Sequence, residues 1–548
     1  MPTDPRPAPA AEASPGVSAA ATSVTADRWR RALAGLLAGV AGLAVADLVQ
    51  AVLGLRAHPV VAVGEAVIEV TPGGVAEFLI DLVGRYDKPL LVGGVAVVVL
   101  LLTAAAGVLT RRSSLLSLLL LAGTAALGGL AVVTRPGAGT GDVLPIAVGL
   151  LTWVLALRVL VAGLSFPAGT AGTAPRQPEP AEQPTDQAGT DRRTLLVRVG
   201  AVTAVAALAG VGGRWVGRAR TTVEASRRLL RLPATRGRVP AGADLTALAG
   251  LDPEPWRTPR DAFYRIDTAL VLPTINPETW RLRVHGLVDR ELEITYQDLV
   301  TRELTEGWVT LCCVSNPVGG DLIGNAWWSG VRVADLLAEA GVQEGADAVL
   351  QTSEDGWNCA TPLTTLTDDR NAMLAVAMNG EPLPVEHGFP VRTVVPGLYG
   401  YVSATKWVVE LEVTRFADVE AYWTQRGWSE QGPVRTMSRI DVPRSGSELP
   451  AGPVRVGGVA WAQQTGIERV EVRVDGSDWV EAELGAVPTD ASETDTWVQW
   501  TAEVDAPAGE HLLSVRATDR SGSTQTSARR NVVPDGATGW HQVDFRTS

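Results

Sequence analysis

The cysteines are the residues of this sequence with the most specific chemistry. There are only three, Cys312, Cys313 and Cys359, and the first two are neighbours, which rarely pair with each other because the resulting ring is strained. A disulfide framework is therefore excluded. An apolar strand leads into the cysteine pair, and a glycine-rich loop follows it. A sulfur in such a position is well placed to face a bound group, so one of the two is a candidate ligand or reactive thiol.

Histidines are scarce and scattered. The five are His58, His285, His387, His511 and His541. Only His58 lies near the end of a long apolar segment, so we do not expect a haem held by two histidines in the apolar part of the chain. No haem-attachment sequence occurs either. We therefore expect no haem in this chain and a separate electron-transfer partner, either a cytochrome or a quinone.

The elements that must position these residues fall into two regimes of composition. Residues 1–220 are dominated by Ala, Leu, Val and Gly, whereas residues 240–548 are rich in Asp, Glu, Arg and Trp, as in a globular protein. The formal net charge of −13 arises mostly in the second part, and no basic run occurs. Nucleic acid is therefore not an expected partner.

Apolar segments of about 20 residues predict four membrane-spanning helices within residues 28–165, after a disordered N-terminus at 1–27. They cover 32–54, 89–110, 115–134 and 143–164. Arginines precede the first span and separate the second from the third, whereas the segment 57–84 is acidic. The positive-inside rule then places the N-terminus in the cytoplasm and predicts the lipid bilayer as a partner.

A tract rich in Pro, Ala, Thr and Gln at 166–191 predicts a cytoplasmic linker. Arg192 and Arg193 follow it and begin a moderately apolar segment at 192–214. This segment either resembles a twin-arginine translocation signal set within the chain or is a plain fifth spanning helix. Both interpretations place the following linker at 215–250 and everything after it outside the cytoplasm. A twin-arginine signal exports folded proteins, so it would also predict a cofactor downstream.

Alternation of apolar and polar residues predicts the elements of the globular half. Residues 263–300 are expected as β structure, including a strand that ends at Gly286, and a helix is expected at 333–340. Beyond Asp441, short alternating strands predict a β-sandwich, with Trp461 and Trp479 in its core. These strands cover 454–462, 469–475 and 512–518, and Asp475 with Gly476 forms a hairpin signal.

Five fragments of the globular half occur in the order seen in the sulfite-oxidase family of molybdopterin enzymes, over residues 255–545. They are 263–268, 273–286, the cysteine strand with 314–316, 379–384, and 387–397 followed by 405–407. The resemblance implies a multi-domain chain. An α+β molybdopterin-binding oxidoreductase domain at 251–425 and an immunoglobulin-like domain at 441–548 would follow the transmembrane bundle, with a homodimer through the C-terminal domain.

The resemblance implies the molybdenum cofactor, in which one cysteine thiolate and one pterin dithiolene hold the metal. Cys313, followed by 314–316, matches the metal ligand, and Cys312 is expected to face the core. Molybdenum prefers soft sulfur donors, and nearby cations would keep the thiolate deprotonated. The anionic pterin needs cations and backbone donors. The positions that match its cradle are Tyr264, Arg265, Thr352, His387, Arg392 and Lys406.

Departures from the family pattern concern the substrate. Animal and plant sulfite oxidases have an arginine close to the asparagine of the cysteine motif, where this chain has Pro317 and Val318, and Trp357 replaces their active-site tyrosine. A pocket without such cations should bind sulfite poorly, although Arg265 is placed to supply a substitute charge. We expect two-electron oxygen-atom transfer on another small substrate, with Cys313, Trp357 and Arg265 as the catalytic residues.

Other functions stay open at this point. The same chemistry run in reverse would make the chain a reductase of sulfoxides or N-oxides. A non-catalytic membrane receptor would not need Cys313 together with Arg392 and Lys406. A transporter is disfavoured because the spans mostly lack intramembrane charges, with Arg158 as the main exception. We therefore expect an extracytoplasmic oxidoreductase anchored in the cell membrane by a multi-pass domain.

Overall fold

The computed structural model describes residues 16–53, 55, 59–71, 83, 86–135, 140–162, 164, 187–220, 239–248, 250–251, 253–488, 492 and 494–548. The chain divides into two units, Met1–Arg220 and Thr221–Ser548. Most of the linkers expected at 166–191 and 215–250 lies outside the described residues, as do residues 1–15 of the N-terminus.

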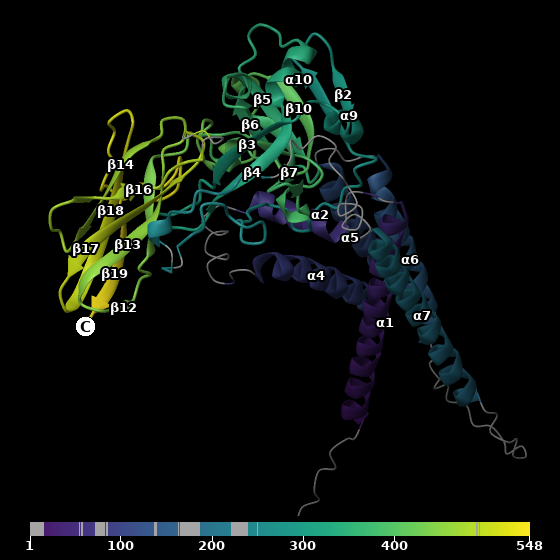
Figure 1. Ribbon diagram of the computed structural model, residues 1–548. Coiled ribbons are helices and arrows are strands. Elements are labelled where there is room, and N and C mark those ends of the chain that lie inside the picture. Colours follow the sequence, from purple (N-terminus) through teal and green to yellow (C-terminus); the bar gives the residue numbers. More distant parts are fainter. Residues whose placement is uncertain are drawn as a thin grey trace, which may run out of the picture. The chain divides into compact units, whose positions relative to one another are not determined.

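The described part of the first unit is helical (Figure 1). Its helices are α1 Gly16–Leu53, α2 Pro59–Val70, α4 Asp87–Leu109, α5 Ser114–Val133, α6 Leu144–Ala162 and α7 Gln187–Arg220. All of these except α2 are long and apolar enough to cross a membrane. Helix α1 begins at Gly16, within the N-terminal segment for which the sequence predicts disorder up to residue 27. Alanines in this segment favour continuing the helix upstream of the apolar span.

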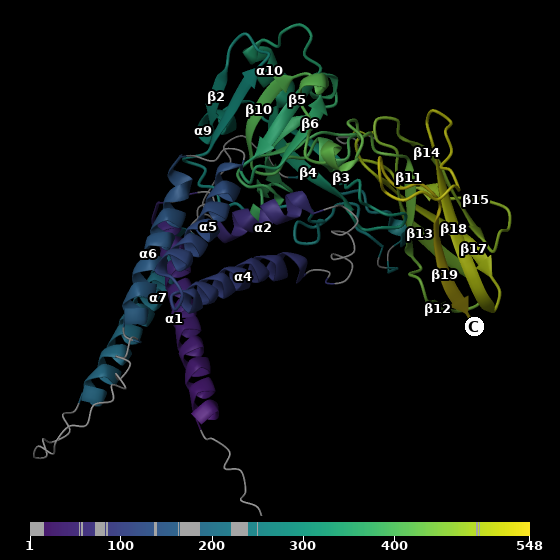
Figure 2. The ribbon, with the colours of Figure 1, turned by 180° about the vertical axis from the view of Figure 1, so that it is seen from behind.

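Glycines of α1 let its neighbours approach closely. A Cβ on Gly35 would lie 2.1 Å from the carbonyl oxygen of Thr103 in α4, and one on Gly42 would meet the ring of Trp153 in α6. The Trp153 indole donates a hydrogen bond of 3.2 Å to the carbonyl of Gly39. Small residues pack apolar helices in this way. Figures 1 and 2 both show α6 and α7 running beside α1.

The central region, residues 253–426, contains two sheets that carry the predicted site. The first has the order β2 Leu292–Thr295, β1 Arg281–Gly286, β10 Val408–Thr414, β5 Ala348–Ser353 and β6 Asn358–Pro362. The second has the order β3 Thr305–Cys312, β4 Ile323–Arg332, β7 Met373–Met378 and β8 Glu381–Pro382, and β9 Arg392–Val394 also pairs with β7. Helix α10, Val333–Ala340, covers the residues predicted for it and ends at Gly341, whose φ is 72°.

The expectation of β structure throughout 263–300 is only partly confirmed. Strands form at Arg281–Gly286 and Leu292–Thr295, but Tyr296–Val300 is helix α9. The reason is a capping box, in which the Thr295 hydroxyl accepts from the Asp298 amide and the Asp298 carboxylate accepts from the Thr295 amide. Residues 263–280 form no strand and run as a loop along the site.

The C-terminal region, residues 437–548, is built from two further sheets (Figure 2). One has the order β11 Met437–Val442, β13 Gly452–Trp461, β17 Val498–Ala506 and β16 Glu483–Leu484. The other has the order β12 Ser447–Leu449, β19 His541–Thr547, β18 Gly509–Asp519, β14 Ile467–Val474 and β15 Val480–Glu481. Apolar side chains of both sheets, including Val456 and Val515, form one buried cluster.

The tryptophan expectations have different outcomes. Trp461 is buried, with 2% of its surface exposed, as predicted. Trp479 is only partly buried, so its assignment to the core is wrong. The chain reverses after β14 in a turn at Asp475 and Gly476, both with positive φ, which directs Trp479 back onto the outward side of that strand. There its ring packs against the guanidinium of Arg473 at 4.6 Å.

The central and C-terminal regions share a core. A single buried cluster joins Trp308 of β3 and Trp327 of β4 to Trp461 of β13 and to Trp497, the residue before β17. The indole of Trp497 donates to the carbonyl of Trp256 at 2.8 Å. Burial of large aromatic side chains contributes strongly to stability, so the two regions stabilise each other.

Candidate active site

Cys313 follows the last residue of β3 and opens a short loop. Its amide donates to the carbonyl of Leu322 at 2.9 Å, and its own carbonyl accepts from the amide of Asn316 at 3.1 Å. We call residues 313–322 the cysteine loop. Cys312, the last residue of β3, lies in the central apolar cluster, as predicted. The thiol of Cys313 is buried, with 8% of the residue exposed.

Burial raises the pKa of the Cys313 thiol, and hydrogen bonding from Ser315 opposes the rise only in part. The expectation that neighbouring cations keep this cysteine deprotonated is therefore wrong for the protein alone. Removal of the sulfur from water disfavours the charged form more than the local donors favour it. A thiolate at this position requires a positive group bound directly to the sulfur.

Three cationic or ionisable residues gather on the segment that follows β8. His387 ends a short 3-10 turn, Val385–His387, Arg392 begins β9, and Lys406 precedes β10. Gly388 makes their approach possible, because its φ is 107° and a Cβ there would lie 2.9 Å from the Cβ of Arg392 and 3.2 Å from the Cα of Lys406. The backbone, not only the side chains, thus brings these residues together.

His387 is neutral at physiological pH. Burial, with Arg392 and Lys406 nearby, lowers its pKa to about 4. Its Nε2 lies 3.2 Å from the carbonyl oxygen of Arg260. Because a carbonyl can only accept, Nε2 carries the proton and Nδ1 is an acceptor. The ring is also held edge-on to Phe263, with centroids 5.6 Å apart.

Arg392 is a buried cation with little compensation. Its guanidinium lies 5.1 Å from the ring centre of Trp328 and donates only long hydrogen bonds, of 3.3 Å to the carbonyl of His387 and 3.4 Å to that of Thr393. Across the described part of the chain, no carboxylate forms an ion pair with it. Burial lowers its pKa to about 10, so it stays charged at neutral pH. A charge buried in this way favours a bound anion.

Lys406 has a different environment. Its Nζ lies 2.8 Å from a carboxylate oxygen of Asp267 and 3.1 Å from the carbonyl of Glu386. Burial lowers its pKa to about 8, against the attraction of Asp267. Arg265 pairs with the same oxygen of Asp267 at 3.0 Å. The two cations therefore share one carboxylate, and the three charged groups together keep a net charge of +1.

Tyr264 connects the thiol to the guanidinium. Burial raises the pKa of its phenol, the charge of the Cys313 thiolate would raise it further, and Arg392 lowers it. The phenol is thus close enough to both groups for their charges to act on it. The ring also stacks on Phe263, at a centroid distance of 5.1 Å. Six of the predicted residues are linked in this way: Tyr264, Arg265, Cys313, His387, Arg392 and Lys406.

Thr352 and Trp357 lie on the hairpin formed by β5 and β6. Thr352 is opposite Glu410 of β10, and the amide of Glu354 donates to the carbonyl of Trp407 at 2.9 Å, which brings the end of β5 beside the segment that carries Lys406. Trp357 is partly buried, and its carbonyl accepts from Ser353 at 2.8 Å. Among the described contacts, none joins Trp357 to the cysteine loop.

Two residues of the cluster escaped the sequence reasoning. Asp267 stands two positions after Arg265, so a search for a counter-ion near the predicted cations would have found it. Trp328 had no such signal, because it is one of two adjacent tryptophans in a buried strand, and only the fold shows which of them faces Arg392.

The site fits a soft metal ion together with an anionic organic group. The buried thiol can become a ligand, the poorly compensated guanidinium can bind an anion, and the Nδ1 of His387 can accept a hydrogen bond. This donor set does not resemble a hydrolytic site. Within the described residues, no group of three or more His, Cys, Asp or Glu side chains could hold a metal ion.

The comparisons with known proteins agree with this chemistry. The model of the oxidoreductase molybdopterin binding domain matches residues 269–423. Mitochondrial sulfite oxidase of Homo sapiens is 29% identical over 307 residues, which cover 48% of this chain and 55% of that protein. The uncharacterized oxidoreductase YuiH of Bacillus subtilis is 36% identical over 153 residues, which cover 28% of this chain and 74% of that protein. The chain thus spans about half the length of the human relative.

Among solved structures, the sulfane dehydrogenase SoxCD from Paracoccus pantotrophus is similar over 53% of this chain and 81% of its own, with a TM-score of 0.45 and 26% identity. The matched domain and the site define a molybdopterin-binding oxidoreductase. The chain belongs to the sulfite-oxidase family of these enzymes, and its expected cofactor is the molybdenum form of molybdopterin.

Proposed function

We propose that the chain is an extracytoplasmic, membrane-anchored enzyme that carries out two-electron oxygen-atom transfer on a small neutral or weakly charged substrate, and that it is not an efficient sulfite oxidase. The observation that carries this proposal is the sharing of Asp267 by Lys406 and Arg265. Arg265, the cation proposed to face the substrate, is paired with this carboxylate, which reduces the positive charge that it offers to an anionic substrate.

Cys313 would hold the molybdenum. Arg392, Lys406, His387, Tyr264 and Thr352 would hold the pterin, with Arg392 as its main unpaired cation. The bound cofactor supplies the two-electron redox change and the oxygen transfer. The protein contributes a protonated Tyr264 phenol and a neutral His387 that accepts at Nδ1. Trp357 and Arg265 would face the substrate.

Sulfite should therefore be a poor substrate. It is an anion with one or two negative charges near neutral pH, and each charge-assisted hydrogen bond that is missing costs roughly 1.5 to 3 kcal/mol. Without the cation that relatives carry where Pro317 and Val318 stand, we expect a specificity constant for sulfite lower than an ordinary enzyme's by on the order of tenfold to several thousandfold. Steady-state assays with an artificial electron carrier would compare sulfite oxidation with reduction of neutral sulfoxides and N-oxides.

The control is Val318→Arg, which returns a cation to the cysteine loop and should raise kcat/KM for sulfite by about tenfold or more. A value for sulfite above about 10⁴ per molar per second in the unchanged protein would contradict the proposal. Turnover of sulfoxides but of no reduced substrate would make the enzyme a reductase of the same family.

The membrane part of the proposal is supported by the first unit. Its five long helices direct large apolar side chains outward, among them Leu101, Leu127, Leu151 and Leu208, which are 62%, 68%, 58% and 74% exposed. Such faces need lipid around them. Five spans from a cytoplasmic N-terminus would place the globular half outside. Electrons would then pass to a separate cytochrome or quinone.

The two C-terminal sheets with their shared core support an immunoglobulin-like domain. A homodimer through this domain belongs to the same proposal. On its outward side, Trp479 and Trp540 lie edge to face at 5.1 Å beside Arg473 and Arg516. Aromatic and arginine side chains are enriched at protein interfaces.

Export by the twin-arginine route can be tested at the start of α7. Replacing Arg192 and Arg193 by lysine keeps the charge, so the first four spans should insert normally, but the translocase should no longer recognise the signal. We expect the globular half to stay in the cytoplasm, where protease added outside intact cells cannot cut it. Arg198→Lys, later in the same helix, is the matched control and should remain accessible. Continued cleavage after the double change would identify a plain fifth span.

A further inference from the structure

The cysteine loop is in contact with the C-terminal region as well as with the central region. Arg439 of β11 donates from Nη1 to the carbonyl of Gly320 at 3.0 Å. This arginine is buried, with 6% of its surface exposed. Its Nε donates to Asp441 at 2.6 Å, and Glu254 lies 3.7 Å from Nη2. The guanidinium is thus oriented by two carboxylates and directs one nitrogen at the loop.

A second contact lies at the turn of the loop. The amide of Gly320 donates to the carbonyl of Pro317 at 2.9 Å, and Gly319 has a φ of 79°, as the third residue of a type II turn requires. A Cβ on Gly319 would lie 2.2 Å from the ring of His541 in β19. That ring is fixed in turn, because its Nδ1 accepts from the amide of Ile440 at 2.9 Å.

The strand that leads to Cys313 is held by the same region. β3 is the edge strand of its sheet. Thr310 of this strand forms hydrogen bonds with residues of the C-terminal region through its amide, its carbonyl and its hydroxyl. Its amide donates to the carbonyl of Asp495 at 2.9 Å, its carbonyl accepts from Gln463 at 2.6 Å, and its hydroxyl accepts from the amide of Trp497 at 2.9 Å. An edge strand that would otherwise present unpaired groups is therefore fixed on that side.

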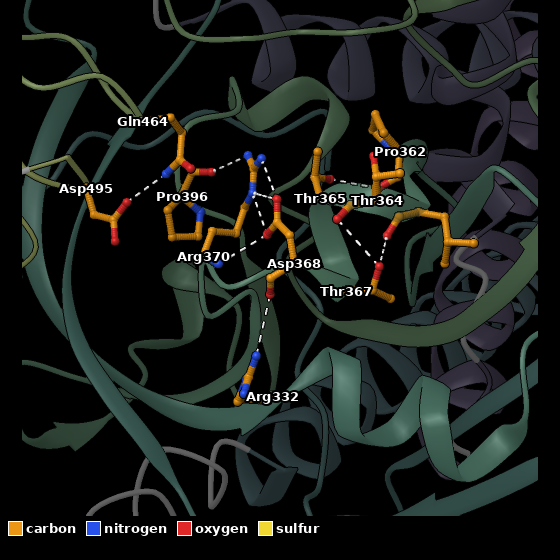
Figure 3. Close-up of polar contacts among 11 residues, drawn as sticks. Arg332, Pro362, Thr364, Thr365, Thr367, Asp368, Arg370, Pro396, Gln464 and Asp495 are labelled. Atoms are coloured by element: carbon orange, nitrogen blue, oxygen red, sulfur yellow. Dashed lines mark hydrogen bonds and ion pairs between the residues drawn. The ribbon is translucent and has the colours of Figure 1, made fainter. Parts of the chain in front are cut away.

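Figure 3 shows contacts of the residues next to those that bind Thr310, among them Gln464 and Asp495. The carboxylate of Asp495 accepts from the side chain of Gln464 at 2.7 Å. Nearby, Arg370 forms an ion pair of 2.8 Å with Asp368 and donates to the carbonyl of Pro396 at 3.1 Å. Gly397, next to Pro396, lies against both Gln464 and Arg370. Gln464, the neighbour of Gln463, is thus packed against the central region.

We propose that Arg439 is a positioning residue that, through the carbonyl of Gly320, fixes the cysteine loop and with it the sulfur of Cys313. The proposal rests on the assignment of Cys313 as the metal ligand. A ligand must be held to a fraction of an ångström to set the properties of a metal centre, and the residues that orient a ligand influence the metal nearly as strongly. The C-terminal region then takes part in building the site, in addition to any role in dimerisation.

The test uses the full chain, both with and without cofactor. In the cofactor-free protein, the rate at which iodoacetamide alkylates Cys313, located by peptide mass spectrometry, reports how firmly the loop is held. Arg439→Gln should raise this rate by roughly tenfold, the effect of losing one charge-assisted contact. Arg439→Lys, which keeps a charged donor for Gly320, should restore at least half of the protection. In the loaded protein, the absorption band for charge transfer from sulfur to metal should shift in Arg439→Gln.

The matched control is Arg516→Gln, which removes an arginine held to Glu471 by two hydrogen bonds of 2.8 and 3.0 Å in the same region, away from the loop. It should leave the alkylation rate and the absorption band unchanged. Gly319→Ala is a second variant, which displaces the loop from the side of His541 and leaves the arginine intact. It should produce the same two changes.

Equal effects of Arg516→Gln and Arg439→Gln would overturn the proposal, because they would indicate general destabilisation. Unchanged alkylation in both Arg439→Gln and Gly319→Ala would overturn it as well. The alkylation measurement needs no metal, so it separates this proposal from the assignment of the ligand. If the loop responds but the metal band does not, Arg439 positions the loop and Cys313 is not the ligand.

Discussion

Replacement of Cys313 by alanine is expected to abolish molybdenum binding. The purified unchanged protein, made in a host that synthesises molybdopterin, should contain about one molybdenum per chain, because one cysteine, Cys313, matches the position of the metal ligand. The variant should lose most of this metal, and its activity should fall by at least about a hundredfold. Loss of a residue that only hydrogen-bonds to a metal ligand costs up to about a hundredfold, and loss of the ligand itself should cost more. Elemental analysis and steady-state rates would measure both.

Cys312→Ala is the matched control, since it removes a sulfur one residue away. Cys312 faces the apolar cluster and receives only a weak hydrogen bond from Asn316 at 3.8 Å. We expect this variant to lose about 1 kcal/mol of stability and to keep its molybdenum. Full activity and full metal content in Cys313→Ala would contradict the ligand assignment, as would equal metal loss in the two variants.

Arg392→Met is expected to separate cofactor binding from stability. In the cofactor-free protein the buried guanidinium makes only long hydrogen bonds to two carbonyls, so a neutral side chain of similar length should leave the free energy of unfolding unchanged or raise it by about 1 kcal/mol. The same change should weaken cofactor binding by roughly tenfold to a few hundredfold, because one charge-assisted contact to an anion is lost. Thermal unfolding and quantification of the released pterin by fluorescence would measure the two effects.

Lys406→Met provides the comparison, because this lysine has a carboxylate partner. Its removal leaves the side chain of Asp267, which is 4% exposed, with Arg265 as its described ion-pair partner. The cofactor-free protein should therefore be destabilised by about 1 to 3 kcal/mol. If Arg392→Met destabilised the cofactor-free protein as much as Lys406→Met does, the interpretation of Arg392 as an uncompensated cation would be wrong.

The elements that the sequence predicted well are those whose signals are local. Helix α10, the strand before Cys313 and the apolar helices of the first unit each follow from periodicity or length. The turn at Asp475 and Gly476 follows from residues that tolerate positive φ. In the site, the order of motif fragments indicated the cationic cluster, and the structure places His387, Arg392 and Lys406 around Gly388, with Arg265 joined to Lys406 through Asp267.

The failures concern features that the local pattern does not determine. The strand pattern over 263–300 was interrupted by a capping box at Thr295 that favours a helix. Trp479 has the composition of a core residue, but its position after a tight turn directs it outward, onto Arg473. The contacts of Arg439 join residues far apart in the chain, and no single-sequence signal indicates which arginine reaches the cysteine loop.

The contacts around the cysteine segment also constrain the order of folding. Gly320 and Arg439 are 119 residues apart, Thr310 and Gln463 are 153 apart, and Thr310 and Trp497 are 187 apart. Closing such long loops is slow, and none of these contacts can form until the C-terminal strands have left the ribosome. A nascent chain therefore exposes Cys313 in an unfinished loop from the time this residue emerges until the C-terminal strands follow it. The metal centre can therefore bind only late in biogenesis, after most of the polypeptide has been synthesised.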